Sequence, residues 1–503
     1  MIKYKNGQII VLGDLEMTYF ISLFTDSNWS AFIYSINLII ALTIIFLERK
    51  NPAASLAWIL VLFVLPIFGI FLYMMLSQNI SRHKISRLSE REMMTMNEEM
   101  KAQIEAMDSG GFAFSKEEAA RWKHMIKLNQ VYGNAFLTQN NQVELLVDGK
   151  EMFESLLHDI NCATKSINVM YYIIKDDKVG KRFLEALTKK AREGVEVRLL
   201  MDALGSRFIN DWRLSEFLAA GGKTAYFFKP KLKYLYFEMN YRNHRKIVVI
   251  DSEIGYTGGF NIAKEYLGQK RKFGYWRDTH IRLQGGAVQD LNARFIMDWR
   301  FASKEQLELD EAYLGAPRDA GTSPVQIVSS GPDSVREEIK RSMMKMITYA
   351  QKSVYLQTPY FIPDPSMLES LKMAAQSGVD VRIMIPCMPD HMFVYWATYA
   401  YCGELIRSGA RVFIYDNGFL HAKTLVVDGE VSTVGSANFD RRSFRLNFEA
   451  NAFIYDKDFG QRMDRQFLTD MEHGHELTRK DYNNRPTAVK FKESISRLLS
   501  DIL

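Results

Sequence analysis

The chain has 503 residues, 47% of them hydrophobic and 24% charged. This length accommodates two or three folding units, and the composition excludes a mainly disordered or fibrous protein. The formal net charge of +5 is small for such a chain, and by itself it favours neither nucleic acid nor an anionic membrane as the partner. The three cysteines, Cys162, Cys387 and Cys402, lack CxxC spacing, which predicts free thiols in a reducing compartment and neither a disulfide nor a zinc site.

Two apolar runs without charged residues lie near the N-terminus, at about 29–47 and 53–76. Each is long enough for a helix that crosses ~30 Å of hydrocarbon, and Pro66 and Gly69 in the second run are tolerated in membrane helices. The runs predict a transmembrane hairpin within an N-terminal anchor of residues 1–80. The alternative, a buried helix pair of a soluble protein, does not require two uncharged runs of this length.

More basic residues flank the two runs than separate them. Arg49 and Lys50 lie between the runs, whereas the flanks carry Lys3, Lys5, Arg82, Lys84, Arg87 and Arg91. Because positive residues stay on the cytoplasmic side, both termini are predicted to face the cytoplasm. Residues 81–142 are polar and charged, which predicts a helical linker whose first helix lies on the surface.

The rest of the chain contains the same sequence plan twice. The first copy reads KSINVMYYII (165–174), REGVEVRLLMD (192–202) and NHRKIVVID (243–251), and the second reads KSVYLQTPYF (352–361), QSGVDVRIMIP (376–386) and LHAKTLVVD (420–428). Each copy alternates strand and helix, which predicts an α/β fold of largely parallel sheets covered by helices. The duplication predicts two similar lobes, 143–318 and 319–503, about a pseudo-twofold axis, joined near the turn-rich segment 315–324.

A motif H-x-K-x4-D occurs once in each copy. Its residues are His244, Lys246 and Asp251, and again His421, Lys423 and Asp428. Apolar β-branched residues follow each lysine, which predicts that the motif lies on a strand with histidine and lysine on the same side. Each aspartate falls at the strand end, where it is expected to fix the following loop. A lone HxK is usually structural, but two copies in duplicated lobes favour a functional role.

Small residues and an asparagine follow each motif at equal spacing. The pairs are Gly258-Gly259 and Gly435-Ser436, and the asparagines are Asn261 and Asn438. Lysine and amide donors suit the nonbridging oxygens of a phosphodiester, whose charge is redistributed at the transition state. We therefore expect Gly259, Ser436, Asn261 and Asn438 to bind phosphate.

A reactive histidine needs an acceptor that orients its ring. Two acidic residues follow the motifs, Asp278 in YWRDTH and Glu449 in NFEAN, and we assign one to each histidine. The alternative is an ordinary loop acid, a common occurrence.

The duplicated motif resembles the phospholipase D superfamily from about residue 143 to the C-terminus. Together with the apolar runs, the ERKNP loop, YWRDTH, TPYFIPD (358–364) and ANFDRRSFRLNFEAN (437–451), the whole chain resembles the bacterial cardiolipin synthases. The resemblance implies an enzyme of the bacterial inner membrane, with its catalytic part facing the cytoplasm and without a metal or other cofactor. The catalytic positions that it implies are His244, Lys246, Asp251, His421, Lys423 and Asp428.

The resemblance also implies a reaction. One histidine attacks phosphorus to form a phosphohistidine, and the other protonates the leaving alcohol and then activates the incoming one. The donor and acceptor would both be phosphatidylglycerol, and the products cardiolipin and glycerol. By analogy His244 is the nucleophile; the sequence itself leaves the two histidines interchangeable, and the oligomeric state open.

Other functions share the motif, because the fold fixes phosphodiester chemistry and not the substrate. A hydrolytic phospholipase D would differ only in admitting water to the phosphohistidine. A nuclease would not need the apolar runs, and the sequence has no dominant basic stripe, so nucleic acid is not an expected partner. A nonenzymatic scaffold would have no need of both intact motifs. The expected partners are therefore phosphatidylglycerol and anionic membrane lipids.

Overall fold

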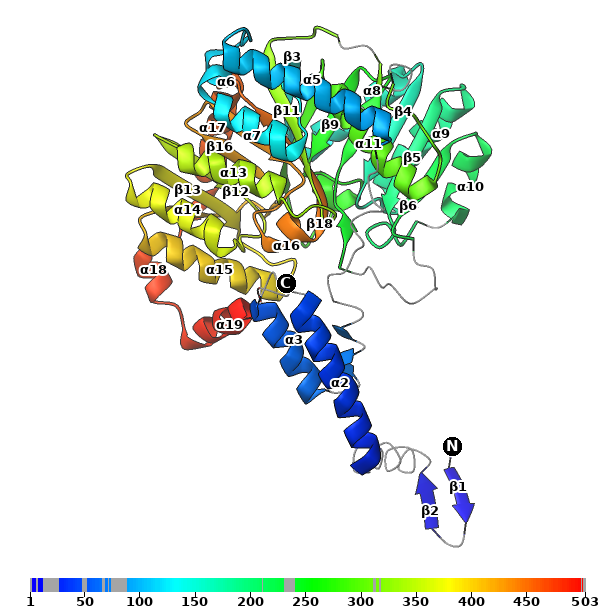
Figure 1. The fold of residues 1–503 in the computed structure, drawn as a ribbon, viewed down its shortest axis with the longest axis vertical. Coiled ribbons are helices and arrows are strands. Elements are labelled where there is room, and N and C mark those ends of the chain that lie inside the picture. Colours follow the sequence, from blue (N-terminus) through cyan, green and yellow to red (C-terminus); the bar gives the residue numbers. More distant parts are fainter. Residues whose placement is uncertain are drawn as a thin grey trace. The chain divides into compact units, whose positions relative to one another are not determined.

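A computed structural model describes residues 2–5, 8–11, 27–47, 52–65, 68–70, 72–73, 88–209, 211–229, 240–310, 314–315, 318–498 and 500 (Figure 1). The chain divides into two compact units, which are described separately. The first comprises Met1–Asn79 with Pro230–Asn240, and the second comprises Ile80–Lys229 with Tyr241–Leu503.

The first unit contains a β-hairpin and a helix pair. Strands β1 (Ile2–Lys5) and β2 (Gln8–Val11) pair antiparallel. Helix α2 (Ser27–Leu47) covers the first apolar run, and α3 (Pro52–Val64) covers the first half of the second run. The amide of Asn37 in α2 donates to the carbonyl of Leu62 in α3, at 3.2 Å, and so links the two helices.

The described part of the structure does not show the predicted transmembrane hairpin. Among the residues that the structure describes, no helix has both the length and the apolar composition needed to cross a membrane. The predicted second run extends to residue 76, whereas α3 ends at Val64. The loop 48–51 and Pro66 lie outside the described residues.

The second unit begins with three helices that precede its sheets. These are α5 (Glu90–Ser109), α6 (Glu117–Arg121) and α7 (Lys123–Gly133). Ser89 and Glu92 form a capping box at the start of α5, which satisfies free backbone amides there. Most of α5 is exposed, as expected for a polar surface helix, although it buries Met100 and Met107.

The first lobe extends from β3 to α11. Its elements are β3 (Thr138–Asp148), α8 (Gly149–Cys162), β4 (Ser166–Tyr171), α9 (Lys178–Arg192), β5 (Glu196–Asp202), α10 (Asp211–Ala219), β6 (Lys223–Phe227), β7 (Arg242–Asn243), β8 (Ile247–Ile250), β9 (Ile254–Gly258), the 3-10 helix η1 (Lys264–Leu267), β10 (Trp276–Gln284) and α11 (Ala287–Ser303).

The second lobe extends from β11 to α19. Its elements are β11 (Ser323–Ser330), α13 (Glu338–Tyr349), β12 (Ser353–Gln357), α14 (Pro365–Gln376), β13 (Asp380–Pro386), α15 (Met392–Arg407), β14 (Arg411–Tyr415), β15 (Phe419–Leu420), β16 (Thr424–Val427), β17 (Val431–Gly435), α16 (Arg441–Arg445), β18 (Asn447–Ile454), α17 (Lys457–Glu472), β19 (Gly474–Glu476), α18 (Arg479–Asn483) and α19 (Thr487–Leu498).

The two sheets repeat one strand order. The first runs β3-β10-β9-β8-β4-β5-β6, and the second runs β11-β18-β17-β16-β12-β13-β14, with β19 added at its end. The expectation of largely parallel sheets is wrong. Three strands of each sheet are parallel, and the others pair antiparallel; a tight turn joins β8 to β9 and β16 to β17, just after each motif.

Short reciprocal pairings join the lobes. Strand β7 of the first lobe pairs with β18 of the second, and β15 of the second pairs with β10 of the first. Both pairings are parallel, the pattern that a twofold relation generates. A buried hydrophobic cluster also draws on both lobes, with Ile247 and Ile281 from the first beside Val426 and Phe448 from the second. The lobes therefore share a core behind these strands.

Candidate active site

The histidine and lysine of each motif lie just before a strand. His244 and Lys246 fall between β7 and β8, and His421 and Lys423 fall between β15 and β16, so the prediction that these residues lie on the strand itself is wrong. The backbone here leaves one lobe's sheet for the other. The amide of His244 donates to the carbonyl of Phe448 at 2.9 Å, and that of His421 donates to the carbonyl of Arg277 at 2.7 Å.

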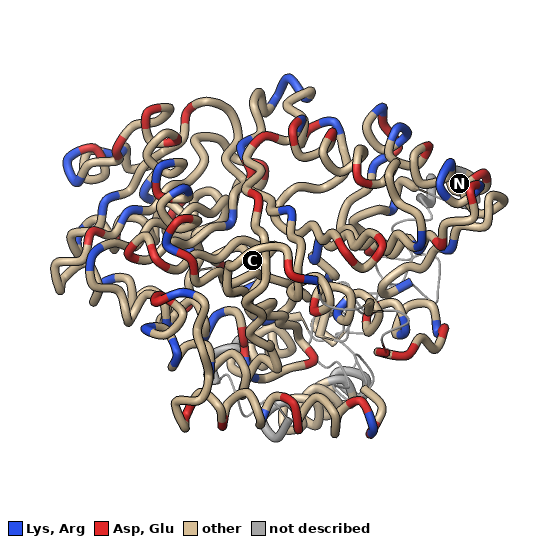
Figure 2. Tube along the Cα trace, turned by 90° about the horizontal axis from the view of Figure 1, so that it is seen from above, with Lys and Arg blue, Asp and Glu red and all other residues tan. Residues whose placement is uncertain are grey.

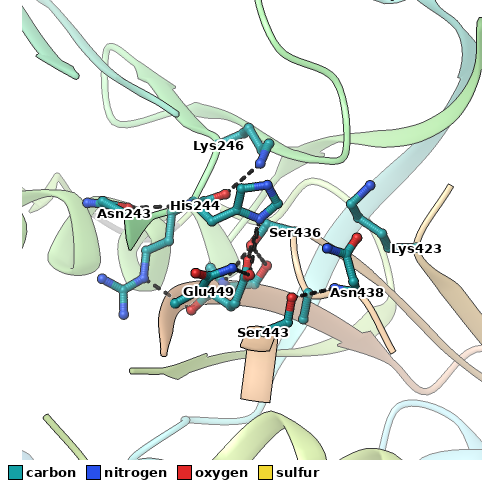
Figure 3. Close-up of polar contacts among 12 residues, drawn as sticks. Asn243, His244, Lys246, Lys423, Ser436, Asn438, Ser443 and Glu449 are labelled. Atoms are coloured by element: carbon teal, nitrogen blue, oxygen red, sulfur yellow. Dashed lines mark hydrogen bonds and ion pairs between the residues drawn. The ribbon is translucent and has the colours of Figure 1, made fainter. Parts of the chain in front are cut away.

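Each histidine receives its carboxylate from the opposite lobe. Nδ1 of His244 lies 3.0 Å from both Oε1 and Oε2 of Glu449 on β18, and Nδ1 of His421 lies 2.6 Å from Oδ2 of Asp278 on β10. The described hydrogen bonds of the two rings all involve Nδ1, so a carboxylate can hold each ring with Nε2 directed to a substrate. Figure 3 shows His244 between Lys246 and Glu449, with Lys423 and Asn438 beside it.

The two lysines hold equivalent positions. Nζ of Lys246 donates to the carbonyl of His244 at 2.6 Å, and Nζ of Lys423 donates to that of His421 at 2.5 Å. Burial lowers the pKa of Lys246 to about 7 and that of Lys423 to about 8, although nearby carboxylates oppose the shift. The lysines also act on one another, since the charge of Lys423 lowers the pKa of Lys246. They therefore belong to one electrostatic centre.

Burial also favours the neutral form of both imidazoles. It lowers the pKa of His244 against the attraction of Glu449, and together with Lys423 it lowers the pKa of His421 to about 4. Burial opposes the ionisation of Asp278 and Glu449, but the lysines and the histidine that each carboxylate binds outweigh it and lower the pKa of both. A neutral ring whose Nδ1–H is held by a carboxylate leaves a lone pair on Nε2, as nucleophilic attack requires.

The two asparagines differ in their contacts. Nδ2 of Asn261 donates to the hydroxyl of Tyr266 at 2.8 Å, and Oδ1 accepts from the amide of Ile173 at 3.1 Å. Asn438 is buried, and its Oδ1 has no hydrogen-bond partner among the described residues. The side chain of Asn438 is therefore the less engaged of the two, because both polar atoms of Asn261 already have partners.

The small residues lie against the carboxylates that hold the histidines. The amide of Gly259 donates to the carbonyl of Thr279 at 2.9 Å, and a Cβ at this position would lie 1.9 Å from Oδ1 of Asp278. The hydroxyl of Ser436 donates to Oε2 of Glu449, while its amide donates to the carbonyl of Ala450 at 3.0 Å. Glycine makes room for one carboxylate, and serine binds the other.

The motif aspartates bind loop amides. Asp251 accepts from the backbone of Thr164, Lys165 and Ser166, at 2.7–2.9 Å, just before β4. Burial opposes its ionisation, but these amides lower its pKa. Asp428 accepts in the same way from residues 351–353 before β12. The described contacts of both aspartates thus fix the entry to a central strand rather than a substrate.

Comparison with known proteins shows the family to which this chain belongs. The family described as "Cardiolipin synthase, PLD-like domain" matches residues 156–299 and 343–471. The cardiolipin synthase of Oceanobacillus iheyensis is 46% identical over 93% of this chain and 98% of that protein, and that of Listeria monocytogenes serotype 4a is 48% identical over 93% and 97%. The chain belongs to the bacterial cardiolipin synthase family. Its residues 35–78 also match the N-terminal family described as "Phospholipase_D-nuclease N-terminal".

A solved structure supports the phospholipase D-like α/β fold of this family member. The phosphatidylserine synthase of Haemophilus influenzae has a TM-score of 0.59, at 18% identity, over 76% of this chain and 100% of that one. At this identity the likeness concerns the fold alone. Both lobes of the cardiolipin synthase family member fall within the phospholipase D-like plan, with one motif in each.

Two aromatic rings lie against the histidines, and neither was among the predicted site residues. The ring centroids of Tyr172 and His244 are 4.9 Å apart, and those of Trp276 and His421 are 5.1 Å apart. Trp276 comes two residues before Asp278 on β10, so strand periodicity places both on one face and could have revealed it. Such rings exclude water from the imidazoles and restrict their rotation.

Proposed function

We propose that this protein is a cardiolipin synthase that transfers a phosphatidyl group from one phosphatidylglycerol to another. The observation that carries the proposal is the pair of histidines, each held by a carboxylate of the opposite lobe, with two lysines in the same electrostatic centre. This arrangement suits a reaction that needs one nucleophile and one acid–base at a single phosphorus. The cardiolipin synthases to which the chain is similar support the lipid substrate.

The reaction proceeds in two balanced steps. Nε2 of His244 attacks phosphorus, the bond to the glycerol oxygen breaks, and protonated His421 gives its Nε2 proton to that oxygen. His421 then takes the proton of the terminal hydroxyl of a second phosphatidylglycerol. That oxygen attacks phosphorus, and the bond to His244 breaks. Cardiolipin and glycerol leave, and both rings return to their first state.

Burial and the charge of the substrate together explain how one site uses both neutral and protonated histidine. Burial keeps the rings neutral in the free protein, which suits the nucleophile. A bound phosphodiester brings a negative charge, which favours protonation of the ring that must act as the acid. Lys246, Lys423 and Asn438 supply donors for the nonbridging oxygens as their charge changes at the transition state.

The charge distribution supports a lipid rather than a nucleic acid as the substrate. Figure 2 shows basic and acidic residues interspersed along the described trace, in keeping with 64 basic and 59 acidic residues in the chain. A groove that follows a nucleic acid backbone would gather basic residues into one band. The products of a lipid assay therefore test the proposal directly.

The domain organisation and membrane topology belong to the same proposal. Residues 1–80 form the membrane anchor, with spans at about 29–47 and 53–76, residues 81–142 form a linker, and the lobes comprise 143–318 and 319–503. The uncharged sequence of α2 and the family match over residues 35–78 support the anchor. The basic flanks of the runs favour a catalytic part on the cytoplasmic side of a bacterial inner membrane.

A product assay decides the function. Full-length protein is incubated with phosphatidylglycerol vesicles, and lipids and glycerol are followed by mass spectrometry. We expect cardiolipin and glycerol in equal amounts, lost in His421→Ala. Both products should persist in His475→Ala, the matched control. This variant removes a surface histidine whose Nδ1 lies 2.6 Å from Oδ2 of Asp416. Phosphatidic acid and glycerol without cardiolipin would instead establish a hydrolytic phospholipase D.

A further inference from the structure

Helix α19 exposes apolar side chains and buries polar ones. The apolar side chains of Phe491 and Leu498 are 66% and 82% exposed, and Ile495 between them is also exposed. The polar side chains of Glu493 and Ser496 are instead buried, at 3% and 1% exposure. A surface helix of a soluble protein normally buries its apolar stripe. The stripe formed by Phe491, Ile495 and Leu498 therefore faces away from the protein that holds the helix.

The polar face of α19 is the side that packs against the rest of the second lobe. Glu493 accepts from Nε and NH2 of Arg485, each at 2.7 Å. Ser500, just after the helix, shares a hydrogen bond of 3.1 Å with the hydroxyl of Tyr401 on α15, and Arg497 pairs with Glu404 of the same helix. Because these contacts fix the buried face, α19 cannot turn its apolar stripe inward without leaving buried charges unpaired.

Further exposed apolar side chains follow corresponding strands of the two lobes. Met392 and Phe393 follow β13, and Phe208 and Trp212 follow β5; all four are more than half exposed. Each segment is linked to the centre. The carboxylate of Asp202, at the end of β5, accepts from the backbone amide of Asn243, next to His244, at 2.9 Å, and the charge of Asp390 acts on Lys423 to raise its pKa against the effect of burial.

Helix α19 packs against α15, the helix that begins with Met392 and Phe393. The Nζ of Lys492 lies 5.3 Å from the centroid of the Trp396 ring, one turn after Met392 and Phe393 on α15. Figure 1 shows α19 lying alongside α15 in the second lobe. The exposed charged residues of α19 are all basic, Lys490, Lys492 and Arg497, the last of which is paired with Glu404, while its one acidic residue, Glu493, is buried in an ion pair. An apolar stripe flanked by basic residues is the pattern of a helix that lies in an anionic lipid interface.

We propose that the catalytic unit docks onto an anionic lipid surface. Its contact residues are the outward stripe of α19, Met392 and Phe393 on α15, and the segment with Phe208 and Trp212. This inference rests on the proposed function in one respect, since a lipid substrate gives docking its use. Docking at the carboxyl ends of β5 and β13 brings the phosphodiester of a membrane lipid to the histidines without drawing its acyl chains out of the bilayer. It is a contact separate from the anchor of residues 1–80.

The test places a fluorophore on the stripe. Full-length protein carrying Phe491→Cys in a Cys162→Ser, Cys387→Ser background is labelled with a polarity-sensitive dye and reconstituted into vesicles of phosphatidylglycerol and phosphatidylcholine. Lipids with a spin-labelled acyl chain serve as quenchers. A matched protein carries the dye at Met373→Cys on α14, another exposed apolar position. We expect quenching at position 491 and none at position 373.

The outcomes separate the possible occupants. A dye at 491 that remains in water overturns the proposal. A dye that is shielded from water but not quenched by lipid also overturns it, because protein then covers the stripe, either a second copy or another segment of this chain. The His421→Ala variant should show the same quenching, so this readout does not depend on catalysis and can succeed where the proposed function fails.

A kinetic measurement extends the test. Phe491→Ser with Leu498→Ser should lower the rate of cardiolipin formation on vesicles about tenfold, since the helix loses most of its buried apolar area at the interface. The rate with monomeric short-chain phosphatidylglycerol should be unchanged. An equal loss with both substrates would indicate damage to the fold and would count against the docking surface, whereas Met373→Ser should retain the rate with both.

Discussion

At the scale of single residues, the site depends on the space beside Asp278. A Cβ at position 259 would lie 1.9 Å from the carboxylate of Asp278, which holds His421. We expect Gly259→Ala to lower the rate of cardiolipin formation at least about a hundredfold, because the displaced carboxylate no longer orients the imidazole. The rate is measured on phosphatidylglycerol vesicles, with circular dichroism to verify folding.

Gly111→Ala provides the matched control. The atoms nearest to a Cβ at that position lie 3.6 Å away, so the substitution meets no steric conflict. Equal rates for Gly259→Ala and Gly111→Ala would show that the position of the carboxylate does not limit the reaction.

The lysines give a second residue-scale prediction, on pH. Burial lowers the pKa of Lys246 to about 7 and that of Lys423 to about 8, whereas the unfolded chain keeps both protons to higher pH. At a pH between these values and the ordinary lysine pKa, the unfolded state therefore binds more protons than the folded state. The contribution of these lysines to the free energy of unfolding accordingly increases as pH rises. A bound phosphodiester reverses the preference, since it favours the protonated lysines.

Affinity for glycerophosphoglycerol, the deacylated headgroup, should therefore fall as pH rises. We expect about a tenfold loss per pH unit for each lysine above its pKa, measured by calorimetry between pH 6 and 9.5. Lys246→Met should bind more weakly and lose the part of the profile that begins near pH 7. An affinity independent of pH would mean that these lysines do not face the phosphate.

At the scale of the elements, the interface between β10 and α17 contains a buried ion pair. Arg277, next to Asp278, is 2% exposed, and its Nε lies 2.9 Å from both carboxylate oxygens of Asp470 in the other lobe. Gln357 donates to the same carboxylate at 2.7 Å. We expect Arg277→Ala to lower the free energy of unfolding by about 3–5 kcal/mol, because it leaves a buried charge without its partner.

Chemical denaturation measures this change. Arg182→Ala removes an exposed arginine paired with Glu154 on the surface of the first lobe and serves as the control, with an expected loss of about 0–1 kcal/mol. Similar losses for the two variants would mean that the lobes are held together elsewhere.

The sequence predicts the elements of this interface better than their pairing. The β-branched runs after Lys246 and Lys423 do form strands, but the histidines precede them, because each chain segment first pairs with a strand of the other lobe. The contact from His244 to Glu449 spans 205 residues, and that from His421 to Asp278 spans 143. Local spacing identifies all four residues, but it holds no information on which histidine meets which acid.

The small residues show the same limit. Their equal spacing after the two motifs marks Gly259 and Ser436 as special, and chemistry suggests a phosphate as the reason. The structure gives a different neighbour, a carboxylate that becomes adjacent only when β9 pairs with β10 and β17 with β18. The sheet register decides this contact, and a sequence pattern does not fix the register across such loops.

At the scale of the whole molecule, the topology of the chain decides on which side of the membrane the catalytic unit works. The basic residues that flank the apolar runs predict the cytoplasmic side. The chain offers a native reporter, since Cys162 at the end of α8 is exposed, whereas Cys402 is buried. We expect a membrane-impermeant maleimide to label Cys162 only after spheroplasts are permeabilised, with mass spectrometry locating the label.

Two variants make that measurement decisive. Cys162→Ser should remove the signal, and Arg49→Cys, between the predicted spans, should be labelled in intact spheroplasts if the predicted topology holds. Labelling of Cys162 in intact cells with protection of position 49 would invert the topology. It would also deprive the enzyme of the cytoplasmic leaflet as its source of phosphatidylglycerol, so the docking surface of α19 would have to meet the opposite leaflet.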